Sequence, residues 1–430
     1  MNAPAEELSS NIPVTSKRRI VIIGGGFAGI EIAKRLKDID GQIILIDRNN
    51  YHTFQPLLYQ VATAALEASS IACPFREIFR RQKNFLFRMA DVKQIIPSRN
   101  TLDTSIGEIE YDQLVVASGS RTNYFGMQDF EANAVPMKSI SDSLRIRNLI
   151  LSNLERSLLV KTMEEQERLL NIVIVGGGPT GVEMAGALGE LKNHILPDDY
   201  PELDFKKMQI HLIDVGERLL PQMSKEASEN AYKFLKKYGI NMWLKTKVLN
   251  FDGQKLRLSN GKDIDTDTVL WAAGVAGGAV PGLNEEIQVA GRLKVDVFNK
   301  VEGYENIFAL GDAACMITKD TPKGHPMLAP VAIQQARHLA ANMHRFTRNQ
   351  PMVPFVFKDK GVMATVGRNN AVVDLKFIKF GGVVGWVVWL FVHLMTLVGF
   401  RNKLVVLVNW AYSYFTYDRG LRLIIRPAKP

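Results

Sequence analysis

The sequence is poor in cysteine. Of 430 residues only Cys73 and Cys315 are cysteines, and they lie far apart in the chain. Without a CxxC pair there is no zinc ribbon and no disulfide framework, so the cysteine usage fits a reducing compartment best.

The N-terminal segment lacks an apolar run. Its first 17 residues carry Glu6 and Glu7, which argues against a secretory signal and against an organelle transit peptide. We expect residues 1–17 to form a loose polar arm. The whole chain is 47% hydrophobic and 23% charged. That composition excludes a disordered or fibrous protein, and the length predicts two or three domains.

Acidic residues are nearly absent from the C-terminal segment. The net charge of the chain is +9, and residues 376–430 hold eight Lys or Arg against the single acid Asp418, a net of +7. The same segment contains three of the five tryptophans. Basic charge mixed with tryptophan and long apolar runs is typical of a membrane surface, so we do not expect nucleic-acid binding.

Near the N-terminus the sequence has the pattern strand, glycine-rich turn, helix, strand. An apolar run over 17–23 precedes the turn at 24–29, a helical pattern continues to Leu36, and a second strand is expected over 42–47. The segment therefore predicts a βαβ unit.

The same pattern returns in the middle of the chain. A strand is expected over 171–175, the turn lies at 176–181, and a helix runs from there toward His194. A loop insertion follows, and the returning strand is expected over 209–214. The two turns begin 152 residues apart, at Gly24 and Gly176, which indicates an internal duplication.

Each glycine turn has the chemistry of a dinucleotide site. The first glycine permits the tight turn, the second lets the backbone approach a pyrophosphate, and the third lets the helix pack on the strand. The N–H groups at the start of the helix then face the phosphates. We interpret the first turn as the FAD site and the second as the NADH site. The glycines concerned are Gly24, Gly26 and Gly29 in the first turn and Gly176, Gly178 and Gly181 in the second.

An acid on the returning strand is expected to bind the ribose of each dinucleotide. Asp47 lies 23 residues after Gly24, and Asp214 lies 38 residues after Gly176 because of the loop insertion. A carboxylate at Asp214 would repel a 2′-phosphate and so favours NADH over NADPH. Arg218 nearby leaves use of both nucleotides open.

A third candidate contact lies in the sequence IFALGDAA at 307–314. Asp312 follows a strand and a glycine, and beside the paired units it is interpreted as a second FAD contact. The alternative is that Asp312 caps the following helix. A helix is expected over 331–345, and a short strand pair over 364–375.

Several of these motifs resemble type II NADH dehydrogenases, the single-subunit, non-pumping NADH:quinone oxidoreductases. The resemblance extends over about residues 18–425. It is carried by HTFQPLLYQVAT at 52–63, GGGPTGVEMAGAL at 176–188, APVAIQQ at 329–335 and the aromatic tail. The dinucleotide motifs are shared with all pyridine-nucleotide flavoprotein reductases, whereas HTFQPLLYQVAT and the aromatic tail are the specific parts. The resemblance implies electron transfer from NADH through FAD to a membrane quinone, ubiquinone or menaquinone.

The resemblance also implies roles for individual residues. The family quinone motif reads Ala-Gln-x-Ala-x-Gln; Ala329, Ala332 and Gln334 match it, but Pro330 replaces the first Gln. Binding of the quinone head would then depend on Gln334 and on backbone groups. The alternative interpretation is that Gln334 and Gln335 simply begin a helix.

Three further residues receive roles in the same way. Glu183 would face the flavin on the proton path, or merely favour the helix dipole from the first turn of its helix. His52 and Gln55 would lie beside FAD, with a surface histidine as the alternative for His52.

Two features of the sequence indicate which electron acceptor the flavin reduces: the missing cysteine motifs and the apolar tail. The CxxxxC motif of flavin-dependent disulfide reductases is missing, and sulfide:quinone oxidoreductases need paired cysteines near the flavin. Residues 380–400 contain no Asp, Glu, Lys or Arg, and a second apolar stretch follows at 404–417. Because the resembling family is monotopic, we expect two helices that lie in or dock to one leaflet and give access to the quinone. We expect this tail to be separable from the flavin chemistry. A single membrane span and a dimer-core helix pair are the alternatives.

Together these observations predict an α/β protein with two Rossmann-like domains and a C-terminal helical membrane-attachment segment. The FAD domain is split in sequence and the NADH domain is inserted into it. We expect a homodimer bound to the cytoplasmic face of a bacterial inner membrane. A soluble NADH-dependent reductase and an NADH-sensing flavoprotein of the apoptosis-inducing-factor kind are the alternatives. The expected boundaries are 1–17 (arm), 18–130 (FAD domain, first part), 131–284 (NADH domain), 285–375 (FAD domain, second part) and 376–430 (membrane-anchoring helices).

Overall fold

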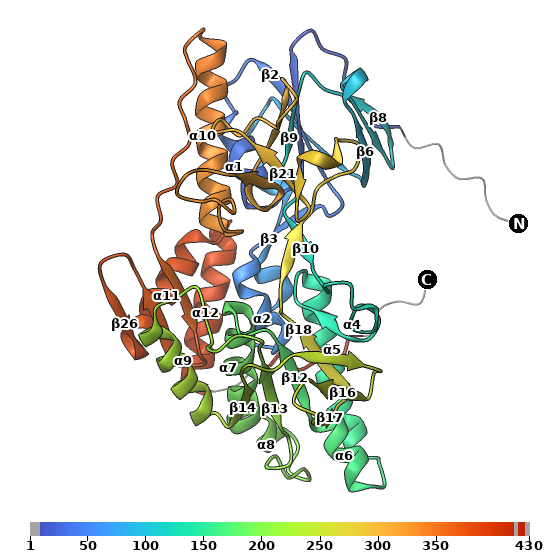
Figure 1. Cartoon of the computed structure of the whole chain (residues 1–430), viewed down its shortest axis with the longest axis vertical. Coiled ribbons are helices and arrows are strands. Elements are labelled where there is room, and N and C mark those ends of the chain that lie inside the picture. Colours follow the sequence, from blue (N-terminus) through green and yellow to red (C-terminus); the bar gives the residue numbers. More distant parts are fainter. Residues whose placement is uncertain (1–8, 417–419, 426–430) are drawn as a thin grey trace, which may run out of the picture. The chain divides into compact units, whose positions relative to one another are not determined.

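Contacts in the computed structural model, which describes residues 9–416 and 420–425, divide the chain into two compact units (Figure 1). They differ from the expected domains, because residues 53–72, 122–130 and 360–375 group with the second unit and residues 275–284 with the first. The described part of the expected C-terminal segment also groups with the second unit. As far as the chain is described, the first unit contains Met1–His52, Cys73–Arg121 and Val275–Asp359, and the second contains Thr53–Ala72, Thr122–Gly274 and Lys360–Pro430.

A parallel five-stranded sheet in the order β22-β9-β1-β2-β5 forms the centre of the first unit. Its strands are apolar runs buried on both sides, as in β1, whose last four residues are all buried. α1 follows β1 directly after the first glycine turn, and α10 packs along α1 (Figure 1). The bounds are Ile307–Ala309 (β22), Gln113–Val116 (β9), Arg18–Ile23 (β1), Gly41–Asp47 (β2), Phe85–Met89 (β5), Phe27–Arg35 (α1) and Ala329–Thr347 (α10).

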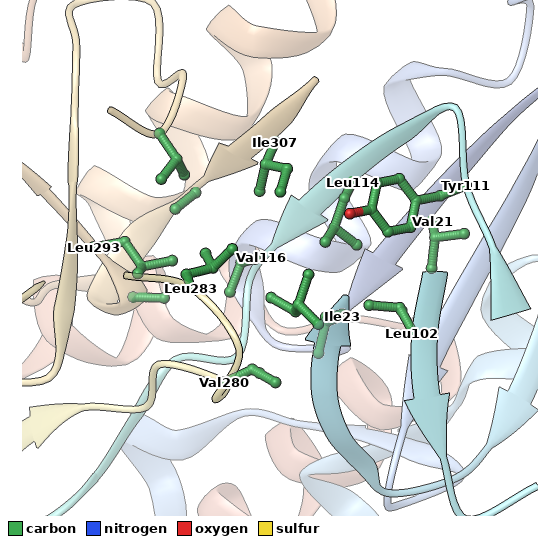
Figure 2. Packing of buried hydrophobic residues seen from close by; sticks show 14 of the residues in the cluster. Val21, Ile23, Leu102, Tyr111, Leu114, Val116, Val280, Leu283, Leu293 and Ile307 are labelled. Atoms are coloured by element: carbon green, nitrogen blue, oxygen red, sulfur yellow. The ribbon is translucent and has the colours of Figure 1, made fainter. Parts of the chain in front are cut away.

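Two small sheets contribute to the hydrophobic core of this unit. Figure 2 shows Leu114 and Val116 of β9 with Ile23 of β1, Leu102 of β7 and Leu293 of β21 in one buried cluster. The small sheets have the orders β6-β7-β8 and β20-β21-β23. Their strands are Val92–Ile96 (β6), Thr101–Thr104 (β7), Gly107–Glu110 (β8), Gln288–Val289 (β20), Arg292–Val295 (β21) and Ala314–Met316 (β23).

The expected loose N-terminal arm is in part bound to the edge of this sheet. The guanidinium of Arg88, on the edge strand β5, donates to the carbonyl oxygens of Ser10 and Asn11, and the Gln42 amide donates to the Pro13 carbonyl at 3.1 Å. The expectation is therefore wrong for residues 10–13. Residues 1–8 of the expected arm lie outside the described part of the chain.

The second unit repeats the sheet architecture in the order β11-β18-β12-β13-β14, again all parallel. α5 begins with a capping box, in which the Ser139 hydroxyl accepts from the Asp142 N–H and the Asp142 carboxylate accepts from the Ser139 N–H. α7 follows β12 after the second glycine turn. The bounds are Val135–Pro136 (β11), Thr268–Trp271 (β18), Ile172–Val175 (β12), Ile210–Ile213 (β13), Ile240–Trp243 (β14), Ile140–Ser157 (α5), Met163–Leu170 (α6), Pro179–His194 (α7) and Lys225–Lys237 (α9).

Shorter elements complete the chain. The expected loop insertion after α7 includes one helical turn, α8. These elements are Tyr51–Thr53 (β3), Leu58–Ala62 (α2), Ala72–Pro74 (β4), Phe75–Ile78 (α3), Ser120–Thr122 (β10), Gln128–Asn133 (α4), Leu196–Asp199 (α8), Val248–Phe251 (β15), Lys255–Leu258 (β16), Asp263–Asp265 (β17) and Val275–Gly277 (β19).

The C-terminal segment is part of the second unit. It forms the antiparallel sheet β24-β25-β26 and the helices α11 and α12, and α11 packs on β25. None of the helices in the described ranges combines the length and the apolar character that crossing a membrane requires. The bounds are Val362–Thr365 (β24), Ala371–Asp374 (β25), Lys379–Gly381 (β26), Gly382–Thr396 (α11) and Phe400–Thr416 (α12).

The inner side of the two tail helices belongs to the core of this unit. Trp389 of α11 is fully buried, and its ring stacks on His393 with 3.8 Å between centroids. The Trp410 N–H of α12 donates to Gln60 Oε1 at 2.8 Å, and the Asn402 amide donates to the Ala72 carbonyl at 2.7 Å. The tail helices are therefore part of the core of the second unit, and the expectation that the tail is separable from the flavin chemistry stays a prediction.

We predict that Trp389→Ala lowers the free energy of unfolding by about 3–5 kcal/mol, because truncation of a buried Trp loses burial and leaves a cavity. Val384→Ala on the exposed side of the same helix should change it by less than about 0.5 kcal/mol. Chemical denaturation followed by tryptophan fluorescence and by circular dichroism measures both. Equal effects of the two substitutions would show that α11 does not pack as described.

Candidate active site

The first glycine turn leaves a cradle open at its middle. Gly24 has φ +97°, and a Cβ there would lie 2.4 Å from the Ala117 carbonyl oxygen. A Cβ at Gly29 would lie 1.8 Å from the Gly24 carbonyl oxygen, whereas one at Gly26 would meet no atom within 4 Å. The outer glycines are thus required by packing, and Gly26 faces open space.

Asp47 holds this turn from the end of β2. Its Oδ2 accepts the Gly25 N–H at 2.7 Å, and its Oδ1 accepts the Asn49 N–H at 2.7 Å. Burial raises the pKa of this carboxyl, and the N–H donors oppose that effect. A Cβ at Gly25 would lie 2.0 Å from Phe75 Cζ. Gly25 is a residue that the motif leaves free, and the sequence analysis missed it.

The second glycine turn has the same arrangement. Asp214 Oδ2 accepts the Gly177 N–H, and Oδ1 accepts the Gly216 N–H at 2.6 Å. A Cβ at Gly181 would lie 1.9 Å from the Gly176 carbonyl oxygen, and one at Gly178 would meet open space. The duplication in sequence is thus a duplication of the carboxylate-held turn.

His52 supports the first turn from behind. Its side chain is 2% exposed, so the surface-histidine alternative is wrong. Nδ1 lies 3.0 Å from the Gly25 carbonyl oxygen, and because a carbonyl only accepts, Nδ1 carries the hydrogen. Burial lowers the pKa of His52 to about 4. The buried Nε2 has no hydrogen-bond partner among the described residues.

Gln55 lies in the second compact unit. It begins a 3₁₀ turn over Gln55–Leu57, is exposed, and its Oε1 accepts from Lys138 Nζ at 3.4 Å. The contact with FAD that the resemblance implies for Gln55 stays a prediction.

Asp312 lies in a short turn between α1 and α10. Its Oδ2 accepts from the Ser120 hydroxyl at 2.6 Å, and no helix is capped by its side chain, so the capping alternative is wrong. Gly311 N–H donates to the buried Gln335 Oε1 at 2.7 Å. A Cβ at Gly311 would contact Ala332 at 2.9 Å. The start of α10 therefore packs against the turn that holds Asp312, through Gln335, to which the sequence analysis assigned no functional role.

The amide of Gln334 is engaged with the backbone. Its Nε2 donates to the Lys358 carbonyl at 3.0 Å, and its Oε1 accepts the Lys358 N–H at 3.0 Å. Asn342, farther along α10, forms the same pair of hydrogen bonds with the Val353 backbone. Its Nδ2 donates to the Val353 carbonyl at 2.9 Å, and its Oδ1 accepts the Val353 N–H at 2.9 Å. The two side chains tie the extended segment 351–358 to α10. This is a structural role that neither interpretation of Gln334 included.

Ala329 and Pro330 occupy the first turn of α10. A proline is favourable there, because the N–H groups of the first turn have no intrahelical acceptor. The proline that departs from the family motif therefore fits the helix start.

Glu183 lies deeper in α7 than expected. It is the fifth residue of the helix, and the first turn contains no acid, so a dipole role from the first turn is not supported. The Thr365 N–H donates to Glu183 Oε1 at 3.4 Å. Burial raises the pKa of Glu183 to about 8, while the Thr365 N–H and the Trp389 indole oppose this.

A hydroxyl pair stands beside this acid. The Tyr59 hydroxyl lies 3.0 Å from Thr365 Oγ1 and accepts from the Gln60 amide at 3.0 Å. Burial raises the pKa of Tyr59, and the Glu183 charge adds to this effect. Tyr59, Thr365 and Trp389 come from three separate segments and were not assigned by the sequence analysis.

An open pocket within the second unit is lined in part by Tyr59 and Thr365. Trp386, Trp389, Trp410 and Tyr414 form its aromatic wall. Its polar side includes Arg368, whose Nε lies 3.4 Å from Glu190 Oε1, with both side chains largely buried. The tail helices thus line the same pocket as the hydroxyl pair.

Two family models match the chain. The pyridine nucleotide-disulphide oxidoreductase model matches residues 18–336, and the NDH2 C-terminal domain model matches residues 360–417. A type II NADH:quinone oxidoreductase of Mycobacterium tuberculosis is 35% identical, over 97% of this chain and 92% of its own length.

Solved structures share the fold. NDH2 of Plasmodium falciparum, in complex with NADH, superposes with a TM-score of 0.86 at 21% identity, over 95% of this chain and 100% of that one. The sulfide:quinone oxidoreductase of Aquifex aeolicus gives 0.71 at 20% identity, over 95% and 96%.

We predict that Gln334→Ala speeds hydrogen exchange at the Lys358 amide about 2- to 10-fold, because one modest hydrogen bond is lost. Asn342→Ala is the matched control and should do the same at the Val353 amide. Exchange measured by mass spectrometry resolves the two segments. A direct role of Gln334 at a substrate would instead appear as a loss of turnover that Asn342→Ala does not share.

Proposed function

Because this chain belongs to the pyridine nucleotide-disulphide oxidoreductases, and within them to the type II NADH:quinone oxidoreductases, we propose that it oxidises NADH through FAD and reduces a quinone without pumping protons. The observation that carries the proposal is the repeated carboxylate-held glycine turn, once in each unit. Two such turns bind two dinucleotides, as a flavin-mediated transfer from NADH requires.

The first turn fits FAD. The turn has open space at Gly26, where a Cβ would meet no atom within 4 Å. Two buried polar atoms, His52 Nε2 and the Ser118 hydroxyl oxygen, have no hydrogen-bond partner among the described residues. These are the features expected where a pyrophosphate and polar ribityl groups would lie. Asp47 would hold the adenosine ribose, and Asp312 the ribityl chain or pyrophosphate. When bound, FAD supplies the two-electron carrier between NADH and the acceptor.

The second turn is suited to NADH. Asp214 holds the turn through Oδ2, its Oδ1 accepts from Gly216 on the loop after β13, and both oxygens keep lone pairs for a ribose hydroxyl. The Arg218 guanidinium donates to the carbonyl oxygens of Met223 and Pro221 at 2.9 and 2.8 Å. These two bonds hold the guanidinium on the backbone of 221–223, which together with the negative charge of Asp214 favours NADH over NADPH.

Glu183 is the residue best suited to hold a proton. Reduction of a quinone by NADH takes up one proton from the medium besides the hydride, so a protonated group near the acceptor accelerates it. A carboxyl with a pKa of about 8 is protonated at neutral pH. We therefore assign Glu183 the role of proton donor to the quinone.

The alternatives lose support. Cys73 and Cys315 are both free thiols, so the structure contains no disulfide of the kind a sulfide:quinone oxidoreductase uses. The tail argues against a soluble acceptor, because each of its helices has an apolar stripe that faces solvent. The stripe on α11 is Val383, Val384, Val387, Phe391 and Met395, and that on α12 is Phe400, Leu404, Leu407, Val408, Tyr412 and Phe415.

We assign these stripes to one leaflet of a bilayer. Their spacing of three or four residues puts each on one side of its helix, while Trp389 and Val406 on the opposite sides are buried. Lys376, Lys379, Arg401 and Lys403 add positive charge that suits an anionic lipid surface. We further propose that the membrane is a bacterial inner membrane and that the protein binds its cytoplasmic face. The proposed acceptor is ubiquinone or menaquinone, and the proposed oligomer is a homodimer.

Rapid mixing separates the two half-reactions of the proposed activity. NADH should reduce the flavin of the holoprotein in a single phase, and a short-chain quinone should reoxidise it. Failure of NADH to reduce the flavin, or of quinone to reoxidise it at a catalytically useful rate, would contradict the proposal.

The same experiment in a pH series isolates Glu183. Reoxidation by quinone should fall as the pH rises through about 8, where the carboxyl loses its proton. Glu183→Gln cannot donate and should be slow at all pH values, by about tenfold or more below pH 8. The raised pKa means that the folded state binds more protons, so wild-type stability should decline between about pH 4.5 and pH 8 and that of Glu183→Gln less steeply. Parallel pH profiles for the two proteins would exclude the assignment.

For the lipid surface, we predict that Phe391→Glu with Phe415→Glu shifts the protein from vesicles to supernatant. The two rings are 64% and 82% exposed, and burial of each apolar side chain in lipid is worth about 2 kcal/mol. Co-sedimentation with phosphatidylglycerol-containing vesicles measures the shift. Leu159→Glu, at 81% exposure outside the tail, is the matched control. Both variants should keep NADH oxidation with ferricyanide, and equal vesicle binding by both would refute the assignment.

A further inference from the structure

The loop between β10 and α4 holds an aromatic side chain in an unfavourable backbone conformation. Phe125 has φ +54°, in the left-handed region that bulky residues rarely adopt. Its ring is nevertheless 61% exposed, so little burial offsets the strain. Strain of this kind is concentrated at ligand clamps and active sites.

The surrounding contacts impose this conformation. Asn123 donates its N–H to the Gly274 carbonyl at 3.1 Å, and its Oδ1 accepts the Phe125 N–H at 2.8 Å. The Trp271 indole N–H donates to the Asn123 carbonyl at 2.9 Å. The loop is thus held on the end of β18 and presents the Phe125 ring outward.

The ring lies at the edge of the second sheet where its parallel strands end. A Cβ at Gly274 would lie 3.0 Å from Phe125 Cζ. The preceding residues of that loop adjoin the second glycine turn, since a Cβ at Gly176 would lie 2.5 Å from the Ala272 carbonyl oxygen. Ligands of open α/β sheets bind at this edge.

The strand order decides which half of a dinucleotide the ring would meet. β12, which leads into the glycine turn, lies between β13 and β18. Asp214 follows β13 and holds the adenosine ribose in the proposed function. A dinucleotide whose pyrophosphate lies over the turn must extend its other half toward β18, where Phe125 stands.

We propose that Phe125 is the aromatic surface against which the nicotinamide ring of NADH rests. The inference depends on the proposed function in one respect, that NADH binds at the second glycine turn. It makes Phe125 a binding and specificity residue for the nicotinamide half, with no part in holding the adenosine half.

Calorimetric titration of the oxidised holoprotein with NAD⁺ and with ADP-ribose tests this directly, because ADP-ribose lacks only the nicotinamide. Phe125→Gly should weaken NAD⁺ binding about 2- to 12-fold, the range of an aromatic pair, and leave ADP-ribose binding unchanged. Phe125→Leu should weaken NAD⁺ binding less. Because glycine accepts the left-handed conformation, the Tm of Phe125→Gly should stay within about 2 °C of wild type.

Ala290→Gly is the matched control. Ala290 also has a positive φ, +51°, and lies in an exposed turn of the first unit. It should change neither affinity. Equal losses for NAD⁺ and ADP-ribose in Phe125→Gly, or none for either, would overturn the inference, as would a marked fall in Tm. If wild-type protein binds neither ligand, the proposed NADH site itself fails, whatever the variants do.

Discussion

A carboxylate at the end of one strand accepts the N–H of a glycine in the turn after the neighbouring strand, and both glycine turns depend on this bond. Asp47 holds Gly25, and Asp214 holds Gly177. The parallel register explains the recurrence, since Ile23 pairs with Ile46 in one sheet and Val175 with Ile213 in the other. Each acid, one residue past the pair, then stands beside the turn. With this glycine held from behind, the next glycine faces open space in both turns.

The tail helices have two different sides that a sequence pattern does not separate. One side of α11 and α12 carries apolar residues into solvent, and the other side completes the core of the second unit around Trp389. The helix α11 is apolar nearly all round because its two sides meet different environments. One side faces the protein core, and the other faces the proposed lipid surface. The proposed attachment to lipid would be coupled to the surroundings of Glu183 through this helix, because Trp389 of α11 also influences the acid.

The acid site shows how chemistry arises from distant segments. Glu183 comes from α7, Tyr59 from α2, Thr365 from β24 and Trp389 from α11. Burial among these elements raises the pKa of Glu183 to about 8, and no single segment would do so. Gln334 shows the opposite case. Its amide looked suited to a substrate, yet it is paired on both sides with the Lys358 backbone, which leaves the start of α10 to act mainly through packing on Gly311.

The sequence by itself determined the two βαβ units, their glycines and their acids, because strand, turn and helix are local patterns. Asp47 and Asp214 each lie at the end of the strand that returns after the helix, so their distance from the first glycine depends only on the length of the helix and loop in between. The sequence also indicated the family and the apolar tail. Only the tertiary structure decided that His52 is buried, that residues 53–72 and 360–375 join the second unit, and that the tail is part of its core. These outcomes depend on contacts between segments up to 350 residues apart, such as Trp410 with Gln60. No local pattern encodes the partner of a side chain at that separation, since burial and pKa are set by what the fold brings against it.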